Sequence, residues 1–259
     1  MDEQAYFTAW KSRFNEPHKI VEPTDLALWG GRLCATLEPA FIFCAGYQAA
    51  IRATFPELDS DGWLAYAASE DRSEQNPKPG VTVRANQLYG FKTWIAASRF
   101  VEDLVLKVGR GIDAQYVSVH STNAGVTITH NPTPGFLPKL SQGIAEFKGA
   151  NFSAINDLTR VPGFADSEPY FIYIALLSAL SEHASAVADK SSGEIIAAEA
   201  RKILQAHGDA SAKLLELDSD VQKLLASSPF ETSGLLSTWG SDARLFSMYS
   251  QGIRTRQTG

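Results

Sequence analysis

Residues 89–98, YGFKTWIAAS, have the character of a β-strand with a core tryptophan, Trp94. Around this stretch, from Gly62 to about Ser153, apolar residues recur with a period of two, as they do in strands that bury one face. The segments that alternate most clearly are VTVRA (81–85), QYVSVHS (115–121) and VTITH (126–130). The turn-forming clusters NPKPG, GRG and NPTPG lie between them. Short strands with no helices between them predict an antiparallel barrel or sandwich over residues 61–162.

A short helical segment is predicted before this β-domain, over residues 1–60. Its first 23 residues are polar and irregular. Thr24, which is followed by an aspartate, is expected to cap an apolar helix. The pair Glu38-Pro39 marks a kink or a break before a second helical piece that ends near Arg52.

A helical bundle is predicted after the β-domain, over residues 163–259. It opens with EPYFIYIALLSALSEHASAVADK (168–190), for which Ser167 is the expected N-cap and Pro169 lies in the first turn. This segment is apolar around most of its circumference at first, which predicts a buried central helix.

Two further helical stretches complete the predicted bundle. The stretch 192–227 has an apolar face and is expected to break near Gly208. A last helix is expected from about Ser237 to Ser250, with Gly252 ending it. The predicted fold class is therefore α+β and multidomain, with a truncated N-terminal helical segment, an antiparallel β-domain and a C-terminal helical bundle.

Composition excludes several classes of function. The chain has 259 residues, of which 44% are hydrophobic and 20% charged, as in ordinary globular proteins. A formal net charge of −6 argues against nucleic-acid binding, which needs a clustered basic face. The start, MDEQAYFTAW, has acids where a signal peptide needs basic residues, and the longest apolar run, Phe171 to Leu180, is too short to span a bilayer. These features predict a cytoplasmic protein without membrane insertion, and Cys34 and Cys44 fit reduced, buried thiols.

Common catalytic motifs are absent from the sequence. There is no glycine-rich phosphate loop, no dinucleotide-binding Gly-x-Gly-x-x-Gly after a strand and no Gly-x-Ser-x-Gly elbow. Five histidines lie far apart, and none pairs at metal-ligand spacing with another histidine or a cysteine: His18, His120, His130, His183 and His207. No metal site is therefore predicted, and His120 and His130 are interpreted as strand-surface or turn residues.

Four segments of the chain carry a resemblance to a known family. They are YAASEDRS (66–73), YGFKTWIAAS (89–98), LSQGIAEFKGANFS (140–153) and DARLFSMYSQG (242–252). In order and position they resemble the acyl-CoA dehydrogenase family, and the likeness covers roughly residues 60–255. Its strongest piece, Gly90 to Ile95, is similar to the family's Gly-x-Lys-x-Trp-Ile strand, where the aromatic residue lies beside the flavin.

The resemblance implies a reaction and a cofactor. In this family an active-site carboxylate removes the α-proton of a fatty acyl-CoA thioester while the β-hydrogen passes as hydride to FAD. The implied function is an FAD-linked oxidoreductase of fatty acid metabolism that acts on the CH–CH bond of an acyl-CoA or related thioester, in a homo- or hetero-oligomer. The alternative is a catalytically inactive relative that serves as a partner subunit or an acyl-binding protein.

The family's catalytic base is the main departure. Many members carry a glutamate in a Tyr-Glu-Gly turn, and here Tyr249 matches the tyrosine while Ser250 takes the place of the glutamate. Tyr249 and Gln251 would then contact the substrate. In a third interpretation, these two residues and Ser250 serve a flavin-independent enzyme that uses the same cavity.

A subset of the family carries its glutamate at the start of the first bundle helix instead. Ser167 stands at that position, and Glu168 is the next residue, about 100° away around the helix. Glu168 is either the relocated base or an acid favoured by the helix dipole.

The family's flavin contacts also differ here. The residues that would contact FAD are Ser69, Ser73, Trp94, Ile95 and Ala96. The first two keep a hydroxyl, whereas Ala96 replaces a threonine or serine of the family. In the family, a glycine-rich segment approaches a neighbouring subunit's FAD. It corresponds here to residues 221–228, where Leu225 and Ala226 add side chains.

The basic residues Arg254 and Arg256 either meet a CoA phosphate or form a solvated tail.

Overall fold

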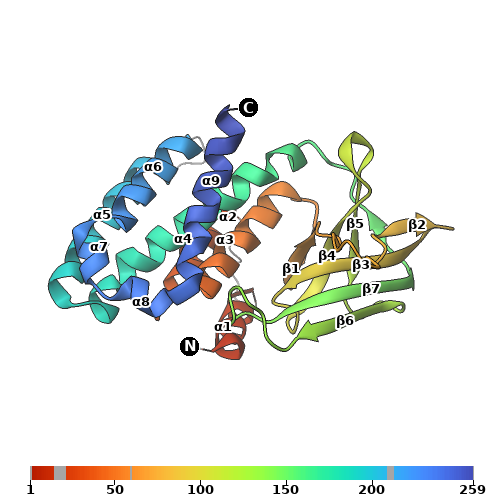
Figure 1. Ribbon diagram of the computed structural model, residues 1–259, viewed down its shortest axis with the longest axis horizontal. Helices are drawn as coiled ribbons and strands as arrows, with labels where there is room; N and C mark the ends of the chain where they lie inside the picture. Colours follow the sequence, from red (N-terminus) through yellow and green to blue (C-terminus); the bar gives the residue numbers. More distant parts are fainter. Residues whose placement is uncertain (1, 15–21, 59, 209–212, 259) are drawn as a thin grey trace. The chain divides into compact units, whose positions relative to one another are not determined.

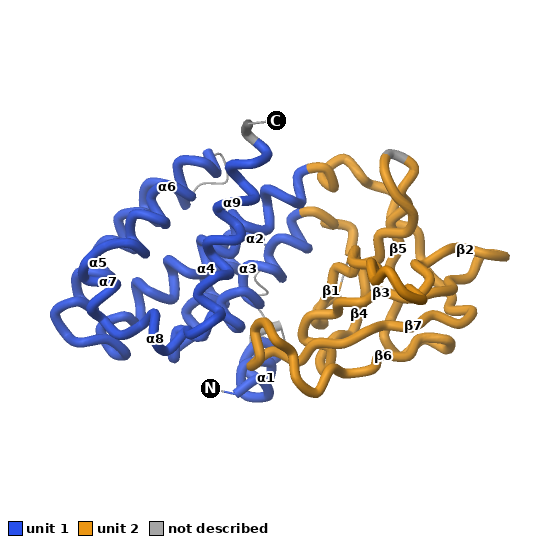
Figure 2. The backbone as a smooth tube through the Cα atoms, in the orientation of Figure 1, with its two compact units in different colours: residues 1–53, 163–259 blue, residues 54–162 orange. Residues whose placement is uncertain are grey.

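The computed structural model describes residues 2–14, 22–58, 60–208 and 213–258. The chain divides into two compact units, shown in Figure 2. One unit is helical and combines Met1–Ala53 with Gly163–Gly259, and the other is the β-unit Thr54–Pro162.

The helical unit contains nine α-helices in its described residues (Figure 1). They are α1 (Glu3–Phe14), α2 (Pro23–Arg32), α3 (Pro39–Thr54), α4 (Phe164–Val187), α5 (Lys190–His207), α6 (Leu214–Leu225), α7 (Ser228–Thr232), α8 (Leu235–Trp239) and α9 (Arg244–Thr258).

Helix α1 contradicts the expectation of an irregular start, because Glu3–Phe14 is helical. Its aromatic residues Tyr6, Phe7 and Trp10 are buried, and the ring of Tyr6 stacks on that of Phe41 at a centroid distance of 4.9 Å. Three aromatic side chains supply enough apolar area to fold a short, otherwise polar segment onto its neighbours. The rest of the predicted irregular stretch, up to residue 21, lies outside the described residues.

The predicted break between the next two helices is confirmed, since α2 ends at Arg32 and α3 begins at Pro39. The predicted cap at Thr24 is wrong: Glu22 is the N-cap, and Pro23 occupies the first turn. Proline suits that position because its missing N–H would have no helical partner there.

Helix α4 is the buried central helix that the apolar run predicted. By length and composition alone, Val161–Val187 could cross a membrane, but 67% of its most apolar window is buried inside the structure, as in the core helix of a bundle. The predicted start at Ser167 is wrong. The helix begins at Phe164 with Gly163 as its N-cap, and Pro169 therefore lies inside the helix.

The predicted break near Gly208 is confirmed, because Gly208 is the C-cap of α5. The last helix differs from the expectation at both ends. A 3-10 turn at Gly240–Ala243 separates α8 from α9, and α9 continues through Gly252 to Thr258. Ile253 explains the extension, because it is 1% exposed and continues the buried face of the helix beyond the glycine.

A glycine in α3 sets how closely that helix approaches α4. A Cβ atom added to Gly46 would overlap the backbone N and Cα of Ile172. We expect Gly46→Ala to lower the free energy of unfolding by about 1–3 kcal/mol, the usual cost of overpacking. Urea denaturation would measure this. Gly252→Ala is the matched control: its Cβ would lie 3.4 Å from the flexible end of Arg256, so a gain of up to about 1 kcal/mol is expected from helix propensity.

The β-unit contains two four-stranded sheets in its described residues, with strand orders β1-β4-β5-β8 and β2-β3-β7-β6. The strands are β1 (Trp63–Ala67), β2 (Thr82–Arg84), β3 (Gln87–Ala96), β4 (Val101–Val108), β5 (Gln115–His120), β6 (Val126–Asn131), β7 (Gln142–Ala150) and β8 (Ser153–Ala154). Strands β2, β5 and β6 confirm the three segments chosen from their alternation, and β3 contains most of the strand predicted at residues 89–98.

Two features of these sheets correct parts of the expectation, namely the closed barrel and the wholly antiparallel pairing. The sheets are open, so no closed barrel forms. Strand β1 pairs with β4 in parallel, whereas the other pairs of neighbouring strands are antiparallel. The parallel pair is possible because the long connection through β2 and β3 brings the chain back to the same end of the sheet.

The two cysteines lie in the helical unit. Cys34 and Cys44 are buried free thiols, as predicted.

Candidate functional site

Ser250 faces inward from α9 and is 7% exposed. Its hydroxyl donates a hydrogen bond to Oδ2 of Asp218 on α6, at 3.0 Å. A serine has no pKa suited to taking a proton near neutral pH, and this hydroxyl is already used as a donor. In this structure Ser250 therefore takes part in a hydrogen bond between two helices of the helical unit.

Asp218 is fully buried and lies at the centre of a set of polar side chains that we call the Asp218 cluster. The Tyr173 hydroxyl lies 2.8 Å from Oδ1, and Arg254 Nε lies 3.3 Å from Oδ2. Gln222 Nε2 lies 3.5 Å from Oδ1 and 3.3 Å from the Phe246 carbonyl. Burial, and then the charge of Asp218, raise the pKa of the Tyr173 hydroxyl. The cluster joins α4, α6 and α9 through hydrogen bonds that satisfy the buried carboxylate.

Asp218 is not among the site residues predicted above, although the sequence carries a signal for it. Leu217, Val221 and Leu224 form the buried face of α6, and Asp218 stands on that face. A carboxylate at a core position of an amphipathic helix indicates a buried polar cluster, because an unpaired buried charge is too costly to keep.

Tyr249, next to Ser250, points to a different helix. Its hydroxyl donates a hydrogen bond to the carboxylate of Glu168 on α4. Both side chains are partly buried. Burial, and then the negative charge of Glu168, raise the pKa of Tyr249, which therefore stays a hydrogen-bond donor. From the sequence, Tyr249 is predicted to contact the substrate, and in this structure it forms a hydrogen bond with Glu168, the alternative candidate for the base.

Glu168 has an unusual electrostatic environment. Burial raises its pKa from 4.5 to about 7, against the opposing effects of the Tyr249 hydrogen bond and the Arg256 charge. A carboxyl group that titrates near pH 7 is matched to general acid–base chemistry at that pH. Because α4 begins a turn earlier than expected, Glu168 lies in the second turn of the helix, where an N-terminal dipole effect is weaker than in the first.

The two C-terminal arginines are paired within the helical unit. Arg254 binds Asp218, and Arg256 contacts Asp166 Oδ1 at 2.9 Å and the Ala165 carbonyl at 2.7 Å. The two arginines are therefore not wholly solvated. A CoA phosphate would have to compete with Asp218 for Arg254 and with Asp166 and the Ala165 carbonyl for Arg256. Gln251 is exposed and lines a shallow depression on α6 and α9.

The predicted flavin contacts lie in the β-unit. Ser69 and Ser73 are exposed and Trp94 is partly buried, whereas Ile95 and Ala96 are fully buried. The Ser69 carbonyl accepts a hydrogen bond from the Thr93 N–H at 3.0 Å, so the structure brings Ser69 beside the Trp94 segment.

Two further contacts hold this part of the β-unit in place. Lys92 Nζ, buried beneath the segment, lies 2.9 Å from Glu70 Oε1. The Trp94 indole donates to Gln142 Oε1 at 3.0 Å. The side chains of Ile95 and Ala96 are buried, so these two residues offer only backbone groups to a ligand.

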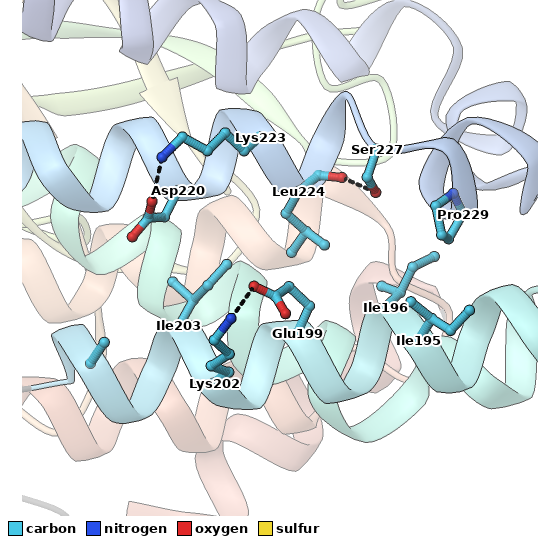
Figure 3. Close-up of a pocket in the computed structure, with 11 residues that line it drawn as sticks. Ile195, Ile196, Glu199, Lys202, Ile203, Asp220, Lys223, Leu224, Ser227 and Pro229 are labelled. Carbon is cyan, nitrogen blue, oxygen red and sulfur yellow. Dashed lines mark hydrogen bonds and ion pairs between the residues drawn. The ribbon is translucent and has the colours of Figure 1, made fainter.

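A groove between α5 and α6 is the other cavity of note, with a volume of about 360 Å³ (Figure 3). Its floor is apolar and its charged rim residues pair with each other. Lys202 lies 3.3 Å from Glu199, and Lys223 lies 3.0 Å from Asp220. The groove holds none of the residues predicted to act on a substrate or a cofactor.

Within the described ranges, no group of three or more His, Cys, Asp and Glu side chains could hold a metal ion. His130 Nδ1 lies 2.9 Å from the Ser98 hydroxyl, and His120 Nδ1 lies 2.8 Å from that of Thr122. His18 lies outside the described residues.

Comparison with known proteins gives a likeness in structure without one in sequence. No family model matches the chain, and no curated protein matches it. Among solved structures, the chain resembles a glutaryl-coenzyme A dehydrogenase in complex with glutaryl-CoA, with a TM-score of 0.59, 11% identity, and coverage of 96% of this chain and 81% of that one.

Two other solved structures are similar. FMN-bound TdsC from Paenibacillus sp. A11-2 matches with a TM-score of 0.55, 12% identity, and coverage of 89% of this chain and 78% of that one. PigA with FAD and proline matches with a TM-score of 0.54, 12% identity, and coverage of 99% and 96%. At these identities the likeness concerns the fold.

Proposed function

We propose, from the premise that this chain has the fold of the acyl-CoA dehydrogenase flavoproteins, that it is a flavin-linked oxidoreductase whose catalytic base is Glu168. The substrate class would be an acyl-CoA or a related thioester. The observation that carries the proposal is the Glu168 carboxyl group, which has a pKa of about 7 and is held by the Tyr249 hydroxyl.

The chemistry asked of this chain is a proton abstraction. The Glu168 carboxylate would take the proton from the α-carbon of the thioester while hydride leaves the β-carbon, which forms the Cα=Cβ double bond of the product. A bound flavin would supply the hydride acceptor. Tyr249 would hold the carboxylate in place, and the partly buried surroundings of Glu168 would favour the protonated acid that the transfer produces.

The residues proposed to hold the flavin are Ser69, Ser73 and Trp94. Ser69 and Ser73 offer exposed hydroxyls, and the hydrogen bond from the Trp94 indole to Gln142 fixes the orientation of the ring. Ile95 and Ala96 would contribute backbone groups only, because their side chains are buried.

A second candidate function is the non-catalytic relative, acting as a partner subunit or as an acyl-binding protein. The observation that favours it is the use of Ser250 as a donor to Asp218, which removes the family's usual base position from the chemistry. The same observation argues against the flavin-independent enzyme, since Ser250 is engaged within the protein.

Flavin uptake separates these candidates. We expect the purified chain to bind FAD or FMN on incubation, with the absorbance of oxidised flavin retained after gel filtration. Anaerobic addition of an acyl-CoA should then bleach that absorbance, because the thioester gives up hydride. A chain that takes up neither flavin but still binds an acyl-CoA by calorimetry would contradict the oxidoreductase and support the acyl-binding protein.

A further inference from the structure

Pro169 interrupts the hydrogen bonds of α4 next to the proposed base. Proline has no N–H, so the carbonyl four residues earlier, that of Ala165, receives no helical hydrogen bond from it. In this structure the Arg256 guanidinium supplies a donor: Nη2 lies 2.7 Å from the Ala165 carbonyl oxygen.

Arg256 makes a second contact on the same turn of α4. Its Nη2 lies 2.9 Å from Asp166 Oδ1, and its Nε lies 3.1 Å from the same oxygen. A planar guanidinium can satisfy a carbonyl and a carboxylate together, which a lysine ammonium does with less geometric control. The last turns of α9 are thereby joined to the first turn of α4.

Glu168 lies between these contacts and the proline. Helix α9 reaches this part of α4 at two points, with Tyr249 on the Glu168 carboxylate and Arg256 on the turn before it. The two residues are seven positions apart, about two helical turns, and so share one face of α9.

We propose that Arg256 is a positioning residue for Glu168: by occupying the carbonyl that Pro169 leaves free, it holds the start of α4 so that the Glu168 carboxylate meets Tyr249. The inference rests on the proposed function of Glu168 only for its catalytic consequence. The contacts themselves belong to the helical unit alone.

The charge of Arg256 also acts on Glu168. Burial raises the pKa of Glu168, whereas the Tyr249 hydrogen bond and the Arg256 charge lower it. The other titratable groups nearby are Tyr47 on α3 and Tyr173 on α4, which face Tyr249, and Asp166, which is paired with Arg256. Loss of Arg256 therefore favours the protonated acid.

Titration of Glu168 in the full-length protein tests the proposal. The carboxyl carbon is followed by NMR in protein labelled with ¹³C-glutamate, and its signal is assigned with Glu168→Gln. We expect Arg256→Gln to raise the pKa of Glu168 and to lower its ionised fraction at pH 7 about two- to threefold. Arg256→Lys should restore part of the shift. Arg244→Gln, at the exposed start of α9, is the matched change of charge and should leave the titration as in the unmodified chain.

The proline gives a second, independent measurement. In Pro169→Ala the alanine N–H can bond the Ala165 carbonyl, so the shift of the urea midpoint caused by Arg256→Gln should be smaller in that background than in the original one. An equal shift in both backgrounds, or equal Glu168 titrations in Arg256→Gln and Arg244→Gln, would overturn the proposal. Neither measurement needs flavin or thioester. A Glu168→Gln protein that still oxidises an acyl-CoA would instead contradict the proposed function.

Discussion

Glu168→Gln is expected to lower the rate of flavin bleaching by an acyl-CoA about 10²–10⁴-fold, the usual loss on removal of a general base. Glutamine keeps the size of the side chain and can still accept the Tyr249 hydrogen bond, but it cannot take the α-proton. Flavin content and thioester affinity should change little. Anaerobic stopped-flow absorbance, with flavin-loaded protein and excess acyl-CoA, measures the rate.

The pH dependence of that rate gives a further check. The base must be ionised, so the rate of the unmodified protein should fall about tenfold per pH unit below the Glu168 pKa of about 7 and level off above it. Glu168→Gln should lose this step. Ser250→Ala is the control at the family's usual base position, and its rate should stay within tenfold of the unmodified protein. The assignment is wrong if Ser250→Ala abolishes bleaching while Glu168→Gln does not.

Asp218→Ala is expected to lower the free energy of unfolding by about 3–5 kcal/mol, the range for breaking a buried charged network. The change leaves Tyr173, Ser250, Gln222 and Arg254 without their shared acceptor. Asp218→Asn should cost less, because an amide oxygen still accepts hydrogen bonds. Urea denaturation followed by circular dichroism measures the loss.

Asp220→Asn is the matched control on the same helix. Asp220 is 38% exposed at its side chain and pairs with Lys223 and His207, so solvent screens its interactions. We expect a loss of about 1 kcal/mol or less. Similar losses in Asp218→Asn and Asp220→Asn would show that the Asp218 cluster does not stabilise the helical unit as argued.

Several elements could be predicted because their signal is local. The alternation in residues 115–121 and 126–130 predicts β5 and β6, and the Glu38-Pro39 pair predicts the break before α3. Each depends on the spacing of apolar side chains or on the restricted backbone before proline. The acyl-CoA dehydrogenase-like fold could likewise be inferred from the order of short motifs, although the solved structures compared above are only 11–12% identical to the chain.

Both ends of α9, the start of α4 and the pairing of β1 could not be predicted, because they depend on distant partners. Pro169 would ordinarily mark a first turn, yet α4 begins earlier, where Arg256 satisfies the carbonyl that the proline leaves free. Gly252 would ordinarily end a helix, yet burial of Ile253 extends α9 past it. The parallel pairing of β1 with β4 depends on a long connection whose path has no local signal.

The sequence by itself indicated most of the helices and strands along the chain and their order, since these follow from residue type and spacing. Only the tertiary structure decided which side chains meet. Ser250 and Tyr249 are adjacent in sequence, but about 100° apart around α9, so one reaches Asp218 on α6 and the other Glu168 on α4. Burial of Glu168, which no local pattern encodes, is the physical reason that its pKa is raised to about 7.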